Sequence, residues 1–340
     1  MSTHDHQPIG VLGGGSWGTA LAHLVRSSAK SPPALLWLRD PEVATAISTT
    51  QRNPRYFGEL PLASGIATTT SLREVAEACR LILVVVPTKA MRQVLRELGD
   101  HLRADHVLVS CSKGLEPGTA KRMSEILREE TCCLEVGTLS GPNLARECVL
   151  GHPSATVVAS RYDEVVRLTQ DALFGPKFRV YGNPDLLGVE LCGALKNVIA
   201  IAAGTADGLG FGDNTKALLV TRGLAEMARF LERLGGDVRT MSGLAGMGDL
   251  MVTCGSALSR NYQVGFRLGK GERLEAVQAD MRQVAEGVVT VKVACDLASR
   301  LGIQSPISRA VFQLAYEGRP AQAVLTDLMS IVPSWEADRR

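Results

Sequence analysis

The sequence predicts an α/β dinucleotide-binding domain of the Rossmann type, followed by a domain built only of helices. Three observations carry this prediction. Short apolar runs alternate with helical patterns through the first half of the chain, a glycine-rich turn follows the first run, and convincing strand patterns stop near Pro184. Strands that alternate with helices favour a parallel sheet covered by helices on both faces.

The expected elements follow from the periodicity of apolar residues. Strands are predicted at residues 9–12, 35–38, 81–86, 106–110, 155–159 and 178–181. A capping box from Ser71 to Glu74 opens a helix that runs to about Cys79. Further helices are predicted at residues 189–206, 217–234, 284–301 and 308–316, and the glycine-rich stretch 241–256 is predicted to be a loop.

Length divides the chain into two domains. A single core stops growing near about 250–300 residues, and this chain has 340. We expect a disordered segment at 1–8, the dinucleotide-binding domain at 9–185 and the helical substrate and catalytic domain at 186–340. The polar start lacks the apolar stretch of a signal peptide, and no segment approaches the about 20 apolar residues of a membrane helix. A cytoplasmic protein without a membrane span is therefore predicted.

Charge and cysteine usage exclude several classes of function. The chain has 37 basic and 35 acidic residues, and no run of Lys and Arg stands out. Nucleic-acid binding is not expected without such a basic patch. The eight cysteines lack the spacing of metal ligands or of a disulfide framework. No metal site is predicted, and most cysteines should be buried thiols in a reducing compartment.

The segment Gly13–Gly18 contains the pattern G-x-G-x-x-G directly after a predicted strand and at the start of a predicted helix. In this context Gly13 allows the tight turn, Gly15 lets the backbone approach a pyrophosphate, and Gly18 lets the helix pack against the strand. The helix start then attracts the phosphates. The alternative is a bare turn in an α/β protein that binds nothing.

The end of the second strand carries both residues that discriminate between NAD and NADP. An acidic residue there binds the ribose hydroxyls, whereas an arginine accepts the 2′-phosphate. Arg39 comes first and favours NADP, and Asp40 follows it. Asp40 is equally suited to cap a helix that begins at Pro41. NADP is the favoured cofactor, and NAD remains possible.

Lys196 is the candidate general base of the helical domain, because no histidine follows His152. On a helix its neighbours form an apolar face: Cys192, Ile199, Ala200 and Ala203. A lysine there is desolvated, which lowers its pKa toward the range of a working base. The alternative is a lysine that extends to solvent or joins a structural ion pair.

Two further segments suit a small anionic substrate. Lys113 follows a predicted strand, at the sheet edge where open α/β proteins bind ligands. Ser259, Arg260 and Asn261 resemble a helix start with Ser259 as N-cap, which places an arginine beside unpaired backbone N–H groups. The alternatives are an exposed lysine and a capped surface helix.

Seven segments, in order along the chain, together resemble the bacterial NAD(P)-dependent glycerol-3-phosphate dehydrogenases. They are Gly13–Ala22, Ser112–Glu116, Ser140–Ala145, Gly193–Val198, Gly212–Lys216, Gly243–Leu250 and Ser259–Asn261. The resemblance extends from about Ile9 to Pro333. It implies the reversible oxidation of sn-glycerol 3-phosphate to dihydroxyacetone phosphate, run in cells mostly toward glycerol 3-phosphate for phospholipid synthesis. It also implies a homodimer whose C-terminal domain is like that of 6-phosphogluconate dehydrogenase.

The resemblance assigns roles residue by residue. Lys196 matches the proton acceptor, Asp249 the acid near it, and Lys113 a group that polarises the substrate and also contacts the cofactor. The other residues that match substrate-binding positions are Gly141, Asn143, Asn197, Thr253, Ser259, Arg260 and Asn261. Residues that match cofactor contacts are Gly13, Gly15, Ser16, Trp17, Gly18, Arg39, Tyr56, Ala145, Arg260, Val284 and Glu286. Asn143 departs from the small residue that bacterial members often carry there.

Two other functions remain open on sequence grounds. A β-hydroxyacid dehydrogenase has the same two-domain plan and a lysine base, but it binds a carboxylate. A nicotinamide-binding regulator without catalysis keeps the glycine-rich turn and has no need of Lys113, Lys196 and Asp249 together.

Overall fold

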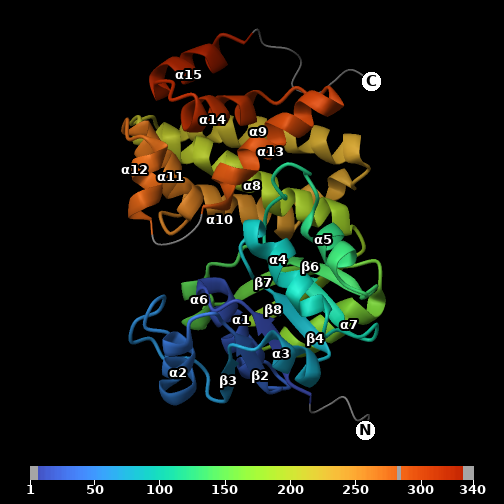
Figure 1. The fold of residues 1–340 in the computed structure, drawn as a ribbon. Helices are drawn as coiled ribbons and strands as arrows, with labels where there is room; N and C mark the ends of the chain where they lie inside the picture. The colour runs from blue at the N-terminus through green and yellow to red at the C-terminus, as the bar shows by residue number, and fades with distance from the viewer. Residues whose placement is uncertain (1–6, 282–284, 332–340) are drawn as a thin grey trace.

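The computed structural model describes residues 7–281 and 285–331. The predicted disorder of residues 1–8 therefore lies mostly outside the described residues, as does Val284. A sheet-containing half and a helical half lie one above the other (Figure 1). The change from strands to helices alone falls between Asn183 and Leu186.

The first half contains an eight-stranded sheet of order β3-β2-β1-β4-β5-β6-β7-β8. Every neighbouring pair is parallel except β6 and β7, which are antiparallel. The strands are β1 Ile9–Leu12, β2 Ala34–Trp37, β3 Ile66–Thr69, β4 Leu81–Val84, β5 Val107–Ser110, β6 Val136–Ser140, β7 Ser154–Ala159 and β8 Phe178–Asn183. The predicted Rossmann-type sheet is thus confirmed, and its last two strands, β7 and β8, run antiparallel to the other six.

Helices cover both faces of this sheet. The helices are α1 Ser16–Ser27, α2 Pro41–Thr50, α3 Leu72–Ala78, α4 Thr88–Gly99, α5 Met123–Glu130, α6 Ala145–Val149 and α7 Asp163–Leu173. Successive strand residues alternate between two cores, because side chains of a strand point to opposite faces. Val11 packs in the core with α1, α6 and α7, whereas Leu12 packs in the core with α3, α4 and α5.

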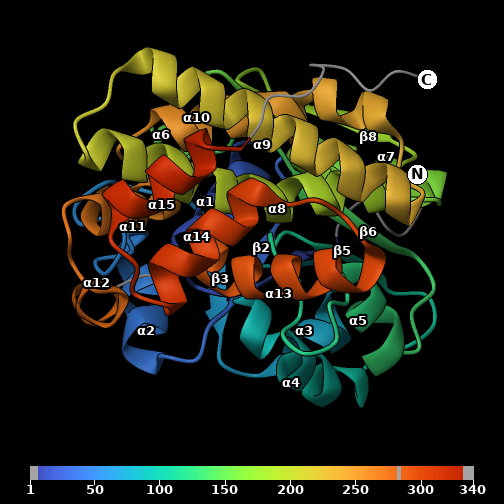
Figure 2. The same cartoon turned by 90° about the horizontal axis from the view of Figure 1, so that it is seen from above.

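The helical half is organised around α8, Leu186–Gly208, which lies near the centre of the view from above (Figure 2). The elements around it are α9 Asp213–Leu234, a 3₁₀ turn Val238–Ser242, a π-helical turn Leu244–Gly248, α10 Asp249–Gly255, α11 Arg260–Gly269, α12 Leu274–Asp280, α13 Glu286–Leu301, α14 Pro306–Tyr316 and α15 Ala321–Met329. The crossing of α8 and α11 brings their backbones into contact. A Cβ atom on Gly265 would lie 2.0 Å from the carbonyl oxygen of Ile201.

The structure differs from the sequence expectations in several details. Strands β3 and β6 were not predicted, and the stretch 241–256, predicted to be a loop, contains the π-helical turn and α10. The sheet is not wholly parallel, because β7 runs antiparallel to β6. By length and composition α8 is long and apolar enough to cross a membrane, but 94% of its most apolar stretch is buried inside the protein.

Candidate active site

Lys196 lies at the centre of a buried polar cluster between the two halves of the molecule. Its Nζ atom donates to Asp249 Oδ1 at 2.7 Å and to Thr253 Oγ1 at 2.6 Å. Lys113, from the loop after β5, donates to the other carboxylate oxygen of Asp249 at 2.5 Å. One carboxylate therefore bridges Lys113 and Lys196, which are 83 residues apart in the sequence.

The local folding explains why these groups meet. Lys196 occupies the middle of α8, where every side chain around it is buried. Asp249 is the first residue of α10, directly follows the π-helical turn Leu244–Gly248, and has a buried side chain. Gly193, one turn before Lys196, allows α8 to pass close to the sheet, since a Cβ there would lie 2.9 Å from Ser140 Oγ.

Burial and charge set the protonation of the cluster. Desolvation lowers the pKa of Lys196 to about 8, although the charge of Asp249 acts in the opposite direction. Burial alone would raise the pKa of Asp249, but the charges of Lys113 and Lys196 outweigh it and lower that pKa. The sequence left a desolvated lysine and an ion-paired lysine as alternatives, and Lys196 is both.

A chain of amide hydrogen bonds links this cluster to α11 and α13. Asn197 Nδ2 lies 3.4 Å from the carbonyl oxygen of Lys113, and Asn197 Oδ1 accepts from Asn261 Nδ2 at 2.9 Å. Asn261 Oδ1 in turn accepts from the N–H of Gly287 at 2.9 Å. The predicted residues Asn197 and Asn261 are thus brought together beside Lys113.

The helix start predicted at Ser259 is confirmed. Ser259 is the N-cap of the ten-residue α11, and its Oγ accepts from the N–H of Tyr262 at 3.3 Å. Arg260 is the first residue of that helix, and its side chain is exposed. This end of α11 therefore combines an arginine with the positive end of a helix dipole, an arrangement that suits a phosphate group.

The glycine-rich turn has the geometry that a dinucleotide requires. Gly13 has φ +127°, a conformation that L side chains rarely adopt. No atom would lie within 4 Å of a Cβ on Gly15, whereas a Cβ on Gly18 would lie 1.8 Å from the carbonyl oxygen of Gly13. The turn is therefore open at Gly15 and closed at Gly18. The buried indole Nε1 of Trp17 has no hydrogen-bond partner among the described residues, which fits a donor reserved for the cofactor.

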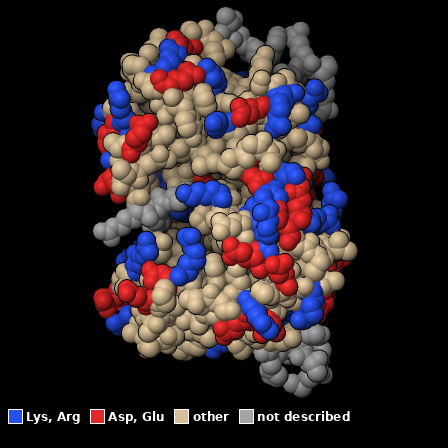
Figure 3. Space-filling model, in the orientation of Figure 1, with Lys and Arg blue, Asp and Glu red and all other residues tan. Residues whose placement is uncertain are grey.

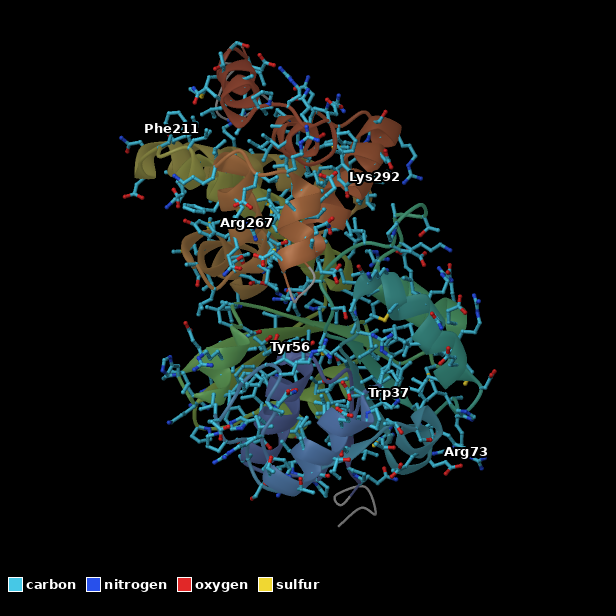
Figure 4. The ribbon with its side chains drawn as sticks, turned by 60° about the vertical axis from the view of Figure 1, so that its left-hand side comes forward. Trp37, Tyr56, Arg73, Phe211, Arg267 and Lys292 are labelled. Atoms are coloured by element: carbon cyan, nitrogen blue, oxygen red, sulfur yellow. The ribbon has the colours of Figure 1, made fainter. Side chains whose placement is uncertain are left out.

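The remaining predicted residues surround this region. The Gly141 carbonyl accepts from Lys113 Nζ at 2.9 Å, and Asn143 Nδ2 donates to the carbonyl of Ala155 at 2.9 Å. Ala145 begins α6 and packs against the core beneath α1. Ser16 is the first residue of α1. Tyr56 lies on the side of the sheet-containing half that faces the helical half, whereas Arg73 lies at its far end (Figure 4).

Glu286 reaches from the helical half to the first turn of α4. Its carboxylate accepts from the N–H of Thr88 at 3.2 Å and from Thr88 Oγ1 at 2.5 Å. Sequence reasoning missed Thr88, although its place after β4 was a usable signal. It also missed Ser140 and Thr290, whose buried hydroxyls have no partner among the described residues. No sequence signal pointed to Thr290.

The space-filling view shows a hollow between the two halves, with Lys and Arg side chains on both sides of it (Figure 3). The strand order reverses between β1 and β4: β2 and β3 follow on the side of β1, and β5 and β6 follow on the side of β4. Open α/β sheets bind ligands at such a topological switch point. Among the described residues, no group of three His, Cys, Asp or Glu side chains is placed to hold a metal ion.

Comparison with known proteins identifies the family. Residues 8–166 match the N-terminal profile of NAD-dependent glycerol-3-phosphate dehydrogenase, and residues 185–326 match its C-terminal profile. The chain belongs to the NAD-dependent glycerol-3-phosphate dehydrogenase family. The resemblance stated from the sequence is thereby confirmed, and with it an NAD(P)-dependent oxidoreductase fold and function class.

Individual members of the family are similar over nearly the whole chain. Glycerol-3-phosphate dehydrogenase [NAD(P)+] of Azotobacter vinelandii is 47% identical over 332 residues, which cover 98% of this chain and 97% of the relative. The enzyme of the same name from Pseudomonas fluorescens is 45% identical over 334 residues, 98% of this chain and 94% of the relative. The crystal structure of glycerol-3-phosphate dehydrogenase from Coxiella burnetii superposes with a TM-score of 0.90 at 34% identity, covering 96% of this chain and 99% of that one.

Proposed function

We propose that the protein interconverts sn-glycerol 3-phosphate and dihydroxyacetone phosphate, with NADP(H) preferred over NAD(H). The observation that carries the proposal is the buried Lys196–Asp249–Lys113 arrangement, beside a dinucleotide turn and a helix start that suits phosphate. Membership of the glycerol-3-phosphate dehydrogenase family supports the same reaction.

The first step assigned to the chain is recognition of the substrate phosphate. Ser259, Arg260, Asn261 and the N–H groups of the first turn of α11 supply positive charge and donors at one place. Because this end of the substrate does not react, its binding energy is available to orient the reacting carbon. Asn197 connects this helix to Lys113, so both ends of a small substrate are held by one hydrogen-bonded chain.

The second step is proton transfer at the C2 oxygen. A bound nicotinamide supplies or accepts the hydride. In the reducing direction Lys196 donates a proton to the oxygen, and in the oxidising direction it accepts one. With a pKa of about 8, Lys196 is mostly protonated at pH 7, and about a tenth is neutral, so both roles are accessible. Lys113 stabilises negative charge that develops on the oxygen, and Asp249 holds both lysines in place.

Residues of the first half are suited to hold the dinucleotide. Gly13, Gly15, Ser16, Trp17 and Gly18 surround the turn after β1, and the start of α1 attracts the pyrophosphate. Arg39 is assigned to the adenosine ribose, and Ala145 to the nicotinamide side. Tyr56 and Glu286 complete the set, together with Val284, which lies outside the described residues.

The experiment that tests this function is the oxidation of NADPH and NADH with dihydroxyacetone phosphate at matched concentrations. Turnover with NADPH well above NADH supports the proposal, and equal or better turnover with NADH retains the reaction and contradicts the cofactor preference. Absence of turnover with both cofactors, with turnover of a 3-hydroxyacid instead, would replace the substrate assignment.

The resemblance also supports three proposals about context. The protein supplies glycerol 3-phosphate for phospholipid synthesis, acts in the cytoplasm, and assembles as a homodimer. Light scattering coupled to size-exclusion chromatography tests the assembly, because the molar mass of a homodimer is twice the 36.3 kDa of the chain.

A further inference from the structure

Asp40, the acidic residue at the end of β2, is already engaged within the protein. Its Oδ1 atom accepts from the N–H groups of Glu42 at 3.0 Å and Val43 at 3.3 Å, so the residue is the N-cap of α2. Its Oδ2 atom lies 3.6 Å from Arg55 Nη1. A carboxylate that binds ribose hydroxyls must have free lone pairs, and the negative charge of this one is neutralised on both sides.

The segment that carries Arg55 is anchored to the glycine-rich turn. Asn53 is fully buried, and its Nδ2 atom lies 3.3 Å from the carbonyl oxygen of Gly14 and 2.9 Å from Thr19 Oγ1. Its Oδ1 atom accepts from the N–H of Arg55 at 3.2 Å. The position of the Arg55 backbone is therefore set by the turn that we assign to the pyrophosphate.

Two guanidinium groups approach the end of β2 from different directions. Arg39 follows β2 after Leu38, is exposed, and makes no hydrogen bond or ion pair with any residue in 7–281 or 285–331. Arg55 comes from the loop after α2, lies 5.9 Å above the ring centroid of Tyr56, and reaches the carboxylate next to Arg39. Arg39, Arg55 and the ion-paired Asp40 thus lie together at the place where a Rossmann-type domain binds the adenosine ribose.

We propose that Arg55 is a second specificity-determining residue of the cofactor site, which binds the adenosine 2′-phosphate of NADP together with Arg39. A phosphate monoester carries a charge of about −1.5 to −2 at neutral pH, more than one arginine neutralises. Arg55 also screens Asp40, whose charge would otherwise repel the phosphate. The ion pair with Asp40 is exposed on both sides and contributes little, so Arg55 can turn to a bidentate phosphate contact at small cost.

The proposal rests on the NADP preference stated above, and a binding measurement separates it from the reaction. Adenosine 2′,5′-bisphosphate and AMP, which differ only in the 2′-phosphate, are titrated into the full-length protein by calorimetry. Arg55→Ala is expected to weaken binding of the bisphosphate by about 10- to 100-fold, the usual range for a hydrogen bond to a charged group. Binding of AMP should change less than about twofold, since AMP lacks the group that Arg55 contacts.

Arg52→Ala is the matched control, because Arg52 lies in the same segment, is similarly exposed and pairs with Glu59 instead. It should leave both affinities unchanged. In the full reaction Arg55→Ala should lower the ratio of kcat/KM for NADPH to that for NADH by the same factor, with kcat for NADPH retained. Arg55→Lys should restore only part of the loss, because lysine cannot make the bidentate contact.

Three results would overturn the inference. Equal loss of bisphosphate and AMP affinity in Arg55→Ala would mean that the substitution disturbs the turn rather than the 2′-phosphate contact. Unchanged bisphosphate affinity would mean that Arg55 does not touch the group. Equal affinity of the unaltered protein for both ligands would mean that no 2′-phosphate site exists. Failure to reduce dihydroxyacetone phosphate would contradict the proposed reaction. The titrations with adenosine 2′,5′-bisphosphate and AMP would still test the role of Arg55 in that case.

Discussion

Replacing Asp249 with asparagine removes the single negative charge that the buried Lys196 and the half-buried Lys113 share, and it retains the volume of the side chain. Lys196 and Asp249 have side chains that are 6% and 3% exposed, so water cannot take over the lost interaction. Breaking a buried ion pair by removing one partner costs about 3–5 kcal/mol. The protein can recover part of this cost by releasing the proton of Lys196.

The pKa of Lys196 should therefore fall below its value of about 8. An opposite charge at contact distance shifts a pKa by about one to three units, and its removal should lower the pKa by about that amount. Reduction of dihydroxyacetone phosphate needs the protonated lysine, so its rate declines as pH rises through this pKa. In Asp249→Asn the decline should begin at least about one pH unit lower than in the unaltered protein.

The assay is the pH dependence of kcat in both directions, with denaturant unfolding measured in parallel. Oxidation of glycerol 3-phosphate needs the neutral lysine, so its rising limb should move in the same direction. Thr253→Val is the matched control, because it removes a neutral hydrogen bond to Lys196 and retains the charge. An unchanged midpoint in Asp249→Asn, with activity retained, would refute the assignment of Lys196 as the titrating group.

Three further predictions follow from the same contacts. Lys196→Ala should lower kcat by about 10²–10⁴-fold, the contribution of general acid–base catalysis, with KM for the cofactor and the far-ultraviolet circular dichroism spectrum unchanged; near-normal kcat would remove its proposed role. Arg260→Ala should raise KM for dihydroxyacetone phosphate more than it lowers kcat, and a pure kcat effect would contradict a phosphate clamp. Gly265→Ala should destabilise the protein by at least about 1–3 kcal/mol, because its Cβ would overlap the Ile201 carbonyl. Gly255→Ala, where a Cβ meets no atom within 4 Å, should leave the midpoint of thermal unfolding nearly unchanged, and equal shifts would contradict the contact argument.

Elements with a strong local signal were predictable from sequence. The run of apolar residues at 81–86 predicted a strand, observed as β4, and Ser71 caps α3 through the N–H of Glu74 as its capping box indicated. β3 was missed because its four residues, Ile66–Thr69, lack a continuous apolar run, and one of them is exposed. Its place in the sheet is fixed by pairing with β2, which is not visible in a local pattern.

The candidate site divides in the same way. The burial of Lys196 could be predicted from its apolar helical neighbours, and the helix start at Ser259 from its capping residue. α10 could not be predicted, since the four glycines of the stretch 241–256 indicate a loop, whereas Leu244–Gly255 is helical in the structure and packs against α8. That Asp249 joins Lys113 and Lys196 depends on three distant segments meeting, which spacing does not encode.

The reversed pair β6–β7 has a consequence for how the two halves can move. Because β7 and β8 run antiparallel to the other strands, the chain leaves β8 at Asn183, at the end of the strands opposite to the site. α8 must then travel along the sheet before Gly193 reaches Lys113 and Ser140. On the way, Glu190 accepts from the N–H of Ser124 at 2.8 Å and from Arg122 Nη1 at 3.0 Å.

One unbroken helix is thus attached to the first half through its early turns and forms the centre of the second. A hinge at residues 184–185, where the two halves join in the sequence, would have to break the hydrogen bonds of Glu190 to Arg122 and Ser124. Any relative motion of the two halves must therefore bend the chain somewhere other than residues 184–185, because the early turns of α8 bind Glu190 to α5.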